Sequence, residues 1–96
     1  MKQLVIDTKN YLIRDQYNEI IQICERGIEK LSDLGPSDND VILSLHKKGK
    51  KFMATIKMAS LGLMFNLKAA SHSPLTAVEQ ALREARQKID RWSALR

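Results

Sequence analysis

Residues 50–70, KKFMATIKMASLGLMFNLKAA, alternate apolar and polar side chains in two runs around a central Ala59-Ser60-Leu61-Gly62 break. A period of two is typical of strands that have one buried and one solvent-exposed face. The tract therefore predicts an antiparallel hairpin whose exposed face carries lysines. The positions expected to be buried are Phe52, Ala54, Ile56 and Met58 in the first run and Leu63, Phe65, Leu67 and Ala69 in the second.

Two amphipathic helices are predicted outside this tract. Apolar residues recur every three or four positions over residues 15–31, and the Leu-Gly-Pro sequence at 34–36 should end that helix, with the glycine in the left-handed conformation. The second helix is expected to begin after an N-cap at Ser73, with Pro74 in the first helical position, and to run to about residue 94.

Two further strands are predicted at residues 2–7 and 41–46, where apolar and polar side chains again alternate. A polar turn at Thr8-Lys9-Asn10 follows the first of them. The lysine-rich sequence before residue 51 supplies the turn into the hairpin, so the complete order of elements is β-α-β-β-β-α.

This order predicts how the elements pack. A strand, a helix and a second strand form a right-handed crossover, so the first two strands should be parallel neighbours, and the last three should form a meander. Both helices are expected on one face of the sheet, because the other face would be polar. The predicted fold class is α+β, a two-layer sandwich with a four-stranded mixed sheet. The polar face would carry Ser44, His46, Thr55, Lys57, Asn66 and Lys68.

Composition favours one soluble domain. The chain has 96 residues, of which 44% are hydrophobic, and this suits a single compact domain over residues 1–96. No long apolar run is present and the N-terminal sequence is charged, so an unexported protein without membrane contact is expected. Cys24 is the only cysteine, which agrees with a reducing compartment and a cytoplasmic location.

Charge is distributed unevenly along the chain. Residues 1–45 carry five basic and eight acidic side chains, whereas residues 46–96 carry eleven basic and three acidic ones, a net charge of +8. Such asymmetry indicates one side that faces a polyanion. The alternative is a soluble domain whose charge is uneven without a binding role.

Four lysines are concentrated at the predicted hairpin turn: Lys47, Lys48, Lys50 and Lys51. Like charges this close repel one another, and phosphates of a nucleic acid would relieve the repulsion. A lysine-rich turn is also an ordinary protection against association of sheet edges.

Four basic side chains of the second helix are further candidates for phosphate contact: Arg83, Arg86, Lys88 and Arg91. At 100° per residue the first two share one side of the helix and the last two share another. The structural alternative is that Glu79 and Glu84 pair with the basic residues four positions later, each pair contributing about 0.2–0.5 kcal/mol.

The polar face of the sheet also carries methionines. Met53 and Met64, with Ile42 nearby, are candidate contacts for a partner, or else they fill space beneath the lysine side chains. No aromatic residue falls on this face by alternation, so the stacking surface of a typical single-strand RNA reader is missing. The roles of Lys57 and Lys68 on the same face stay open.

Patterns typical of enzymes are absent. His46 and His72 belong to distant elements, and Cys24 lies on an apolar helix face. No paired carboxylates, glycine-rich phosphate loop or metal-ligand spacing occurs. We therefore expect a protein that is not an enzyme and has no cofactor, metal or small-molecule substrate.

Several segments resemble the ribosome hibernation-promoting factor family, also called the sigma-54 modulation proteins or Y-type ribosome-associated inhibitors. Residues 69–82 read A-x-S-x-S-x-x-x-AVEQAL, with Ser73 where the family often has a capping Asp and residues 77–79 similar to its Ala-Ile-Asp. Residues 6–13, IDTKNYLI, are similar to the strand, polar turn and helix entry of the family. The resemblance covers essentially the whole chain.

This resemblance implies binding to the small ribosomal subunit, in the channel that messenger and transfer RNA otherwise occupy, and a block of translation in resting, stationary-phase cells. It also implies that basic side chains of both helices contact ribosomal RNA phosphates. Arg26 and Lys30 of the first helix join the candidates on this ground, and Arg91 matches a customary basic position. Away from the ribosome a monomer is expected.

Two other functions are compatible with the same pattern. The open sheet face, with Met53 and Met64, would suit a regulatory module that binds another protein. A general binder of double-stranded RNA would recognise the shape of any A-form duplex through phosphate and 2′-hydroxyl contacts.

Overall fold

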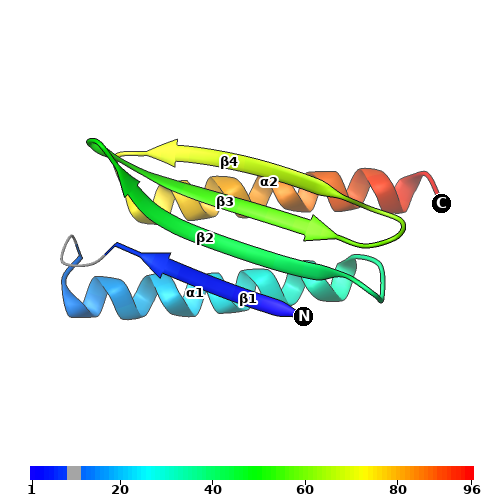
Figure 1. Cartoon of the computed structure of the whole chain (residues 1–96), viewed down its shortest axis with the longest axis horizontal. Helices are drawn as coiled ribbons and strands as arrows, with labels where there is room; N and C mark the ends of the chain where they lie inside the picture. Colours follow the sequence, from blue (N-terminus) through cyan, green and yellow to red (C-terminus); the bar gives the residue numbers. More distant parts are fainter. Residues whose placement is uncertain (9–11) are drawn as a thin grey trace.

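The structure, a computed structural model, describes residues 1–8 and 12–96. Its elements are, in order, β1 (Lys2–Asp7), α1 (Arg14–Leu34), β2 (Asp40–Lys48), β3 (Lys51–Ala59), β4 (Phe65–Ser71) and α2 (Pro74–Ala94). The predicted α+β fold and its β-α-β-β-β-α order are confirmed (Figure 1). The part of the predicted polar turn at residues 9 and 10, and residue 11 of the family-like segment, lie outside the described residues.

The sheet has the predicted mixed topology. Its strand order is β1-β2-β3-β4, with β1 parallel to β2 and the other neighbours antiparallel. Ile56 lies opposite Leu43 of β2 on one side and opposite Leu67 of β4 on the other. This register brings the apolar side chains of three strands to one face.

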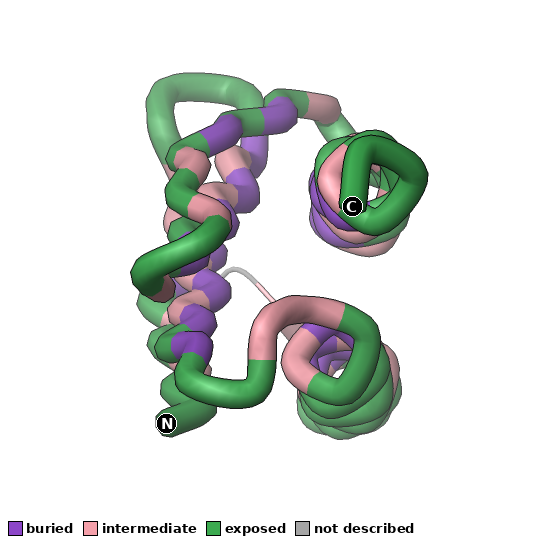
Figure 2. Tube along the Cα trace, turned by 90° about the vertical axis from the view of Figure 1, so that its right-hand side faces the viewer, coloured by how far each residue is buried: buried purple, intermediate pink, exposed green. Residues whose placement is uncertain are grey.

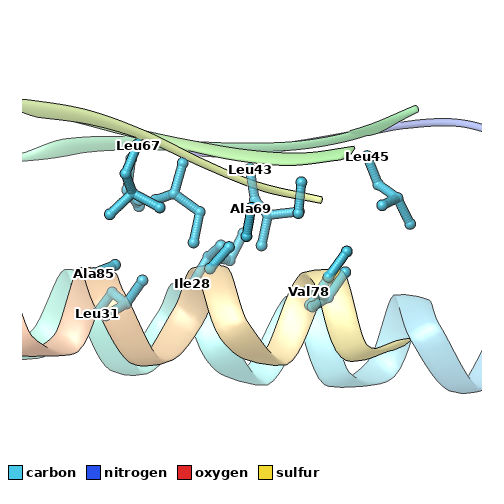
Figure 3. Close-up of a cluster of buried hydrophobic side chains, with 14 of the residues drawn as sticks. Ile28, Leu31, Leu43, Leu45, Leu67, Ala69, Val78 and Ala85 are labelled. Carbon is cyan, nitrogen blue, oxygen red and sulfur yellow. The ribbon is translucent and has the colours of Figure 1, made fainter. Parts of the chain in front are cut away.

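Both helices cover that face, so the sandwich has two layers (Figure 2). Leu43, Leu45 and Leu67 of the sheet point toward Ile28 and Leu31 of α1 and toward Val78 and Ala85 of α2 (Figure 3). Leu43 and Leu45 are fully buried, and each such side chain contributes about 1.5–3 kcal/mol to stability through the hydrophobic effect. The side of α2 that packs on the sheet includes Ala77, Ala81 and Ala85, and these small side chains let the helix lie close to the strands.

The two helices run side by side in the same direction (Figure 1). They are in close contact at Gly27 of α1, where an added Cβ would lie 2.6 Å from the δ-methyl carbons of Leu82 on α2. A residue without a side chain at this position therefore allows the contact between the helices.

Helix α1 ends at Leu34, as the Leu-Gly-Pro sequence predicts, but Gly35 adopts an extended conformation with φ −82° instead of the expected left-handed one. Two strand boundaries differ from the predictions. Strand β2 continues to Lys48, two residues beyond its predicted end. Leu63 precedes β4 instead of lying in it, because β4 begins at Phe65. The N-cap at Ser73 is confirmed: its Oγ accepts a hydrogen bond from the Thr76 N–H at 3.3 Å.

The connection from α1 to β2 is held by Asn39, whose side chain is only 6% exposed. Its Nδ2 donates hydrogen bonds to the carbonyl oxygens of Ser32 and Pro36, and its Oδ1 accepts one from the Ser32 hydroxyl at 3.1 Å. The loop can therefore leave the helix without a left-handed glycine, because this side chain satisfies two of the exposed helix-end and loop carbonyls.

Replacing this side chain should destabilise the fold. Asn39→Ala leaves three partner groups without their hydrogen bonds and should lower the free energy of unfolding by about 1–3 kcal/mol. Chemical denaturation followed by circular dichroism measures this loss. The matched control, Ser37→Ala in the exposed part of the same loop, should change stability by less than about 0.5 kcal/mol. Equal effects of the two substitutions would contradict the role of Asn39.

Candidate polyanion-binding surface

The lysines of the β2–β3 hairpin lie at the ends of two strands and not in a long loop. Lys48 pairs directly with Lys51, so only Gly49 and Lys50 form the turn. Gly49 has a φ of +63°, a conformation that glycine adopts without strain and that suits a two-residue hairpin. Lys47 and Lys48, which the sequence predicts to lie in the turn, are instead the last residues of β2.

Alternation along the strands separates these lysines between the two faces of the sheet. Lys47 lies opposite the buried Phe52, on the side of the helices, and its ammonium nitrogen is 4.9 Å from the centroid of that ring. Lys48 and Lys51 belong to the open face. Cross-strand neighbours have Cβ atoms about 4.5–5.5 Å apart, so these two lysine side chains leave the sheet side by side. Within the described residues neither lysine has an ion pair.

The turn is attached to the start of α2. The carbonyl oxygen of Lys50 accepts a hydrogen bond from Nδ1 of His72 at 3.1 Å. No sequence pattern links His72 to the hairpin. This contact orients the tip of the hairpin relative to the N-terminus of α2.

Both helices begin at the hairpin end of the sheet (Figure 1). Strand β1 ends at Asp7 opposite His46, and β4 ends at Ser71 opposite Phe52, so each following helix starts near the ends of β2 and β3. Helix N-termini carry a partial positive charge. The hairpin lysines and the two helix N-termini therefore favour anions at the same end of the molecule.

A second group of basic residues lies along the contact between the helices. Lys30 follows Gly27 by three residues and Arg86 follows Leu82 by four, so these two side chains flank the contact about one turn farther along the parallel helices. Arg26 and Arg83 are exposed at the neighbouring positions of α1 and α2, and Arg83 lines a shallow depression of α2 together with Glu79 and Glu84. We call Arg26, Lys30, Arg83 and Arg86 the helix ridge.

Ion pairing on α2 differs from the alternative considered from the sequence. Arg86 pairs with Asp90, with 3.0 Å between Nε and Oδ1. No pair of Arg83 with Glu79, or of Lys88 with Glu84, occurs in the described part of the chain. Arg83 and Lys88 therefore keep their charges available to a ligand.

Lys88 and Arg91 lie apart from both groups. They line a shallow groove of about 310 Å³ near the C-terminus of α2, together with residues of the β3–β4 loop. The ten predicted basic residues thus occupy three places: the hairpin end, the helix ridge and this groove.

The methionines of the expected protein-contact patch are separated. Met53 lies opposite His46 and Ala70, whereas Met64 precedes Phe65, which lies opposite Met58. Met58 is five residues along β3 from Met53, which in an extended strand is about 16 Å, and Met64 lies at the Met58 end. Met53 and Met64 therefore do not form one contact patch on the open face.

The described residues do not form a cluster of catalytic side chains. Burial, and secondarily the charge of Glu25, raises the pKa of the Cys24 thiol to about 12, so this buried residue is not a nucleophile at neutral pH. Among residues 1–8 and 12–96 no group of three or more His, Cys, Asp or Glu side chains is arranged to hold a metal ion. In the same part of the chain neither helix is long and apolar enough to cross a membrane.

The fold has solved counterparts. The N-terminal domain of Protein Y from Thermus thermophilus superposes with a TM-score of 0.69 and 18% identity, and the match covers 94% of each chain. A ribosomal subunit interface protein from Coxiella burnetii superposes with a TM-score of 0.66 and 14% identity, over 96% of this chain and 98% of the other. No protein-family model matches the sequence, and no curated protein does.

These likenesses concern the fold, because the identities are low. They extend over nearly the whole chain, as the resemblance in sequence predicted.

The paired lysines should cost stability. Lys51→Glu replaces a directly opposed like-charge pair with an opposite-charge pair, so the free energy of unfolding should rise by about 0.5 kcal/mol at low salt. Thermal and chemical denaturation in low and high salt would measure the gain and its screening. A loss of stability would show that the two lysines do not repel each other in the folded chain.

The buried thiol should make stability depend on pH in the alkaline range. The pKa of the Cys24 thiol is raised from its ordinary value of 9.0 to about 12 in the folded chain, so above pH 9 the unfolded chain loses a proton that the folded chain retains. Stability from this group is complete below pH 9 and declines between pH 9 and 12. The difference in unfolding free energy between the wild type and Cys24→Ala should therefore shrink over this range. A constant difference would contradict the raised pKa.

Proposed function

We propose that this chain is a ribosome-associated protein, without enzymatic activity, that binds small-subunit ribosomal RNA in the channel for messenger and transfer RNA. The observation that carries the proposal is the match, over 96% of the chain, to the fold of a ribosomal subunit interface protein. The protein would act as a monomer in the cytoplasm and block translation in resting, stationary-phase cells.

The hairpin end supplies the first contact with RNA. Lys48 and Lys51 are opposed on neighbouring strands and have no ion pair among the described residues, so their repulsion is uncompensated in the free protein. A phosphate placed between them would relieve that repulsion and release counterions. Lys50 at the tip and Lys47 beside Phe52 add positive charge on either side.

The helix ridge supplies the second contact. Arg26, Lys30 and Arg83 are exposed and have no ion pair in the described residues, whereas Arg86 would have to exchange Asp90 for a phosphate. Arginine can bind a phosphate through two parallel N–H groups. Together, the hairpin end and the helix ridge would bind the RNA backbone along two sides of the folded chain.

Recognition would depend on RNA shape and phosphate positions. The described residues on the open face of the strands include no Phe, Tyr or Trp on which a base could stack. A structured RNA such as the ribosomal channel suits this surface better than an extended single strand does.

Charge reversal at the hairpin tests this proposal. Lys48→Glu with Lys51→Glu should weaken binding to purified small subunits at least tenfold, because two phosphate contacts become repulsive. Co-sedimentation through sucrose gradients at moderate salt measures the bound fraction. The matched control is Lys57→Glu with Lys68→Glu, which makes the same charge change on the open face of β3 and β4 and should weaken binding less than threefold.

Equal losses in the two variants would show that binding depends only on net charge, and would contradict a hairpin site.

Competition with a duplex RNA separates the proposal from a general double-stranded RNA binder. A modest excess of duplex should leave the ribosome-bound fraction unchanged, and full displacement by duplex would favour the general binder.

A further inference from the structure

An apolar groove lies at the end of the molecule opposite the lysine hairpin, where the C-terminal part of α2 approaches the β3–β4 loop (Figure 1). The molecule is 43 Å long, so this groove and the hairpin are well separated. Its side chains are Leu63, Met64, Phe65, Trp92 and Leu95, with Lys88 and Arg91.

The lining of the groove is accessible to a partner. Met64 is 75% exposed and Leu95 is 87% exposed, although both are large apolar side chains. Single exposed apolar residues are common on protein surfaces, but here they gather with Leu63 around one depression. Methionine adapts its shape to different apolar groups, which suits a docking surface.

The loop side of the groove is held in place before any partner arrives. The hydroxyl of Ser60 accepts a hydrogen bond from the Leu63 N–H and donates one to the Leu63 carbonyl, each at 2.9 Å. The Leu61 N–H donates to a carboxylate oxygen of Asp38 at 3.4 Å. A partner would therefore pay little conformational entropy to order this loop.

Two cations border the apolar lining. Lys88 and Arg91 are three residues apart on α2 and so share one side of the helix. Both are exposed, and neither has an ion pair within the described residues. Their charge favours a partner with carboxylates next to its apolar group.

The aromatic residues of the groove are not placed to receive a nucleotide base. The guanidinium of Arg96 covers one face of Trp92, at 4.6 Å from the ring centroid. Trp92 and Phe65 both pack against the hydrophobic core, and the strongly exposed side chains of the groove are aliphatic. Aliphatic side chains bind apolar protein side chains through the hydrophobic effect but offer a base no stacking partner.

We propose that this groove docks a segment of a partner protein in which acidic residues flank a large apolar side chain. The apolar anchor would lie on Leu63, Met64 and Leu95, and the carboxylates would pair with Lys88 and Arg91. This site goes beyond the proposed RNA contact and shares no residue with the hairpin end or the helix ridge. It gives Lys88 and Arg91 a protein ligand in place of ribosomal RNA.

The test begins with a peptide library displayed on phage. Panning on the wild-type chain should enrich peptides with Asp or Glu around Phe, Leu or Trp, and panning on Lys88→Glu with Arg91→Glu should not. Synthetic copies of the enriched peptides are then titrated, with emission of Trp92 as the reporter, because it is the only tryptophan and it lines the groove.

Affinity should fall at least tenfold in Lys88→Glu with Arg91→Glu, and also in Met64→Asp, an exposed loop position. The matched variant Lys2→Glu with Lys68→Glu makes the same charge change at exposed positions outside the groove and should bind within twofold of the wild type. Small subunits should still bind the Lys88→Glu, Arg91→Glu variant, so failure of the groove and failure of the proposed function give different results.

Three outcomes would overturn the proposal. The first is that no acidic, apolar consensus is enriched, or that its binding ignores the reversal of Lys88 and Arg91. The second is that this reversal abolishes small-subunit binding while no peptide binds, which would show that Lys88 and Arg91 contact RNA. The third is concentration-dependent self-association, lost in Met64→Asp, in place of peptide binding, which would make a second copy the occupant.

Discussion

The register between β2 and β3 is the constraint on which the rest of the structure depends. One alignment places Ile56 opposite Leu43 in the core and Lys48 opposite Lys51 on the open face. A slip by one residue would exchange the faces, exposing the apolar row and burying lysines against the helices. The short turn with Gly49 at positive φ holds this alignment. The same turn therefore fixes both the apolar core pairs and the exposed pair of lysines.

From this register follows a division of the positive charge. The hairpin end holds two opposed lysines near two helix N-termini, the helix ridge holds arginines and a lysine on the exposed sides of the two helices, and the remaining pair borders an apolar groove. Each setting favours a different ligand. Clustered cations without apolar neighbours favour phosphates, whereas cations beside exposed apolar side chains favour acidic peptides that carry an apolar residue. Net charge alone does not distinguish these settings; the burial of the neighbouring residues does.

Much of the fold could be predicted, because periodicity identifies which side chains must be buried together. The strands containing Ile56 and Leu67, and the helix after Ser73, follow directly from such patterns. Contacts between distant segments could not be predicted: Asn39 rather than a left-handed Gly35 shapes the end of α1, and His72 reaches the Lys50 carbonyl. The separation of Met53 from Met64 required knowing where β4 begins. Helix periodicity already separated Lys88 from Arg83, but not the groove that Lys88 shares with the β3–β4 loop.

The most direct measurement of the central claim is competition for the channel of purified small ribosomal subunits. Subunits are loaded with messenger and transfer RNA, and binding of the labelled chain is compared with binding to empty subunits. Occupation of the channel by the chain predicts that loading reduces its binding at least tenfold, and that excess chain slows the binding of transfer RNA in return, because linkage is reciprocal. Undiminished binding to loaded subunits would contradict the account.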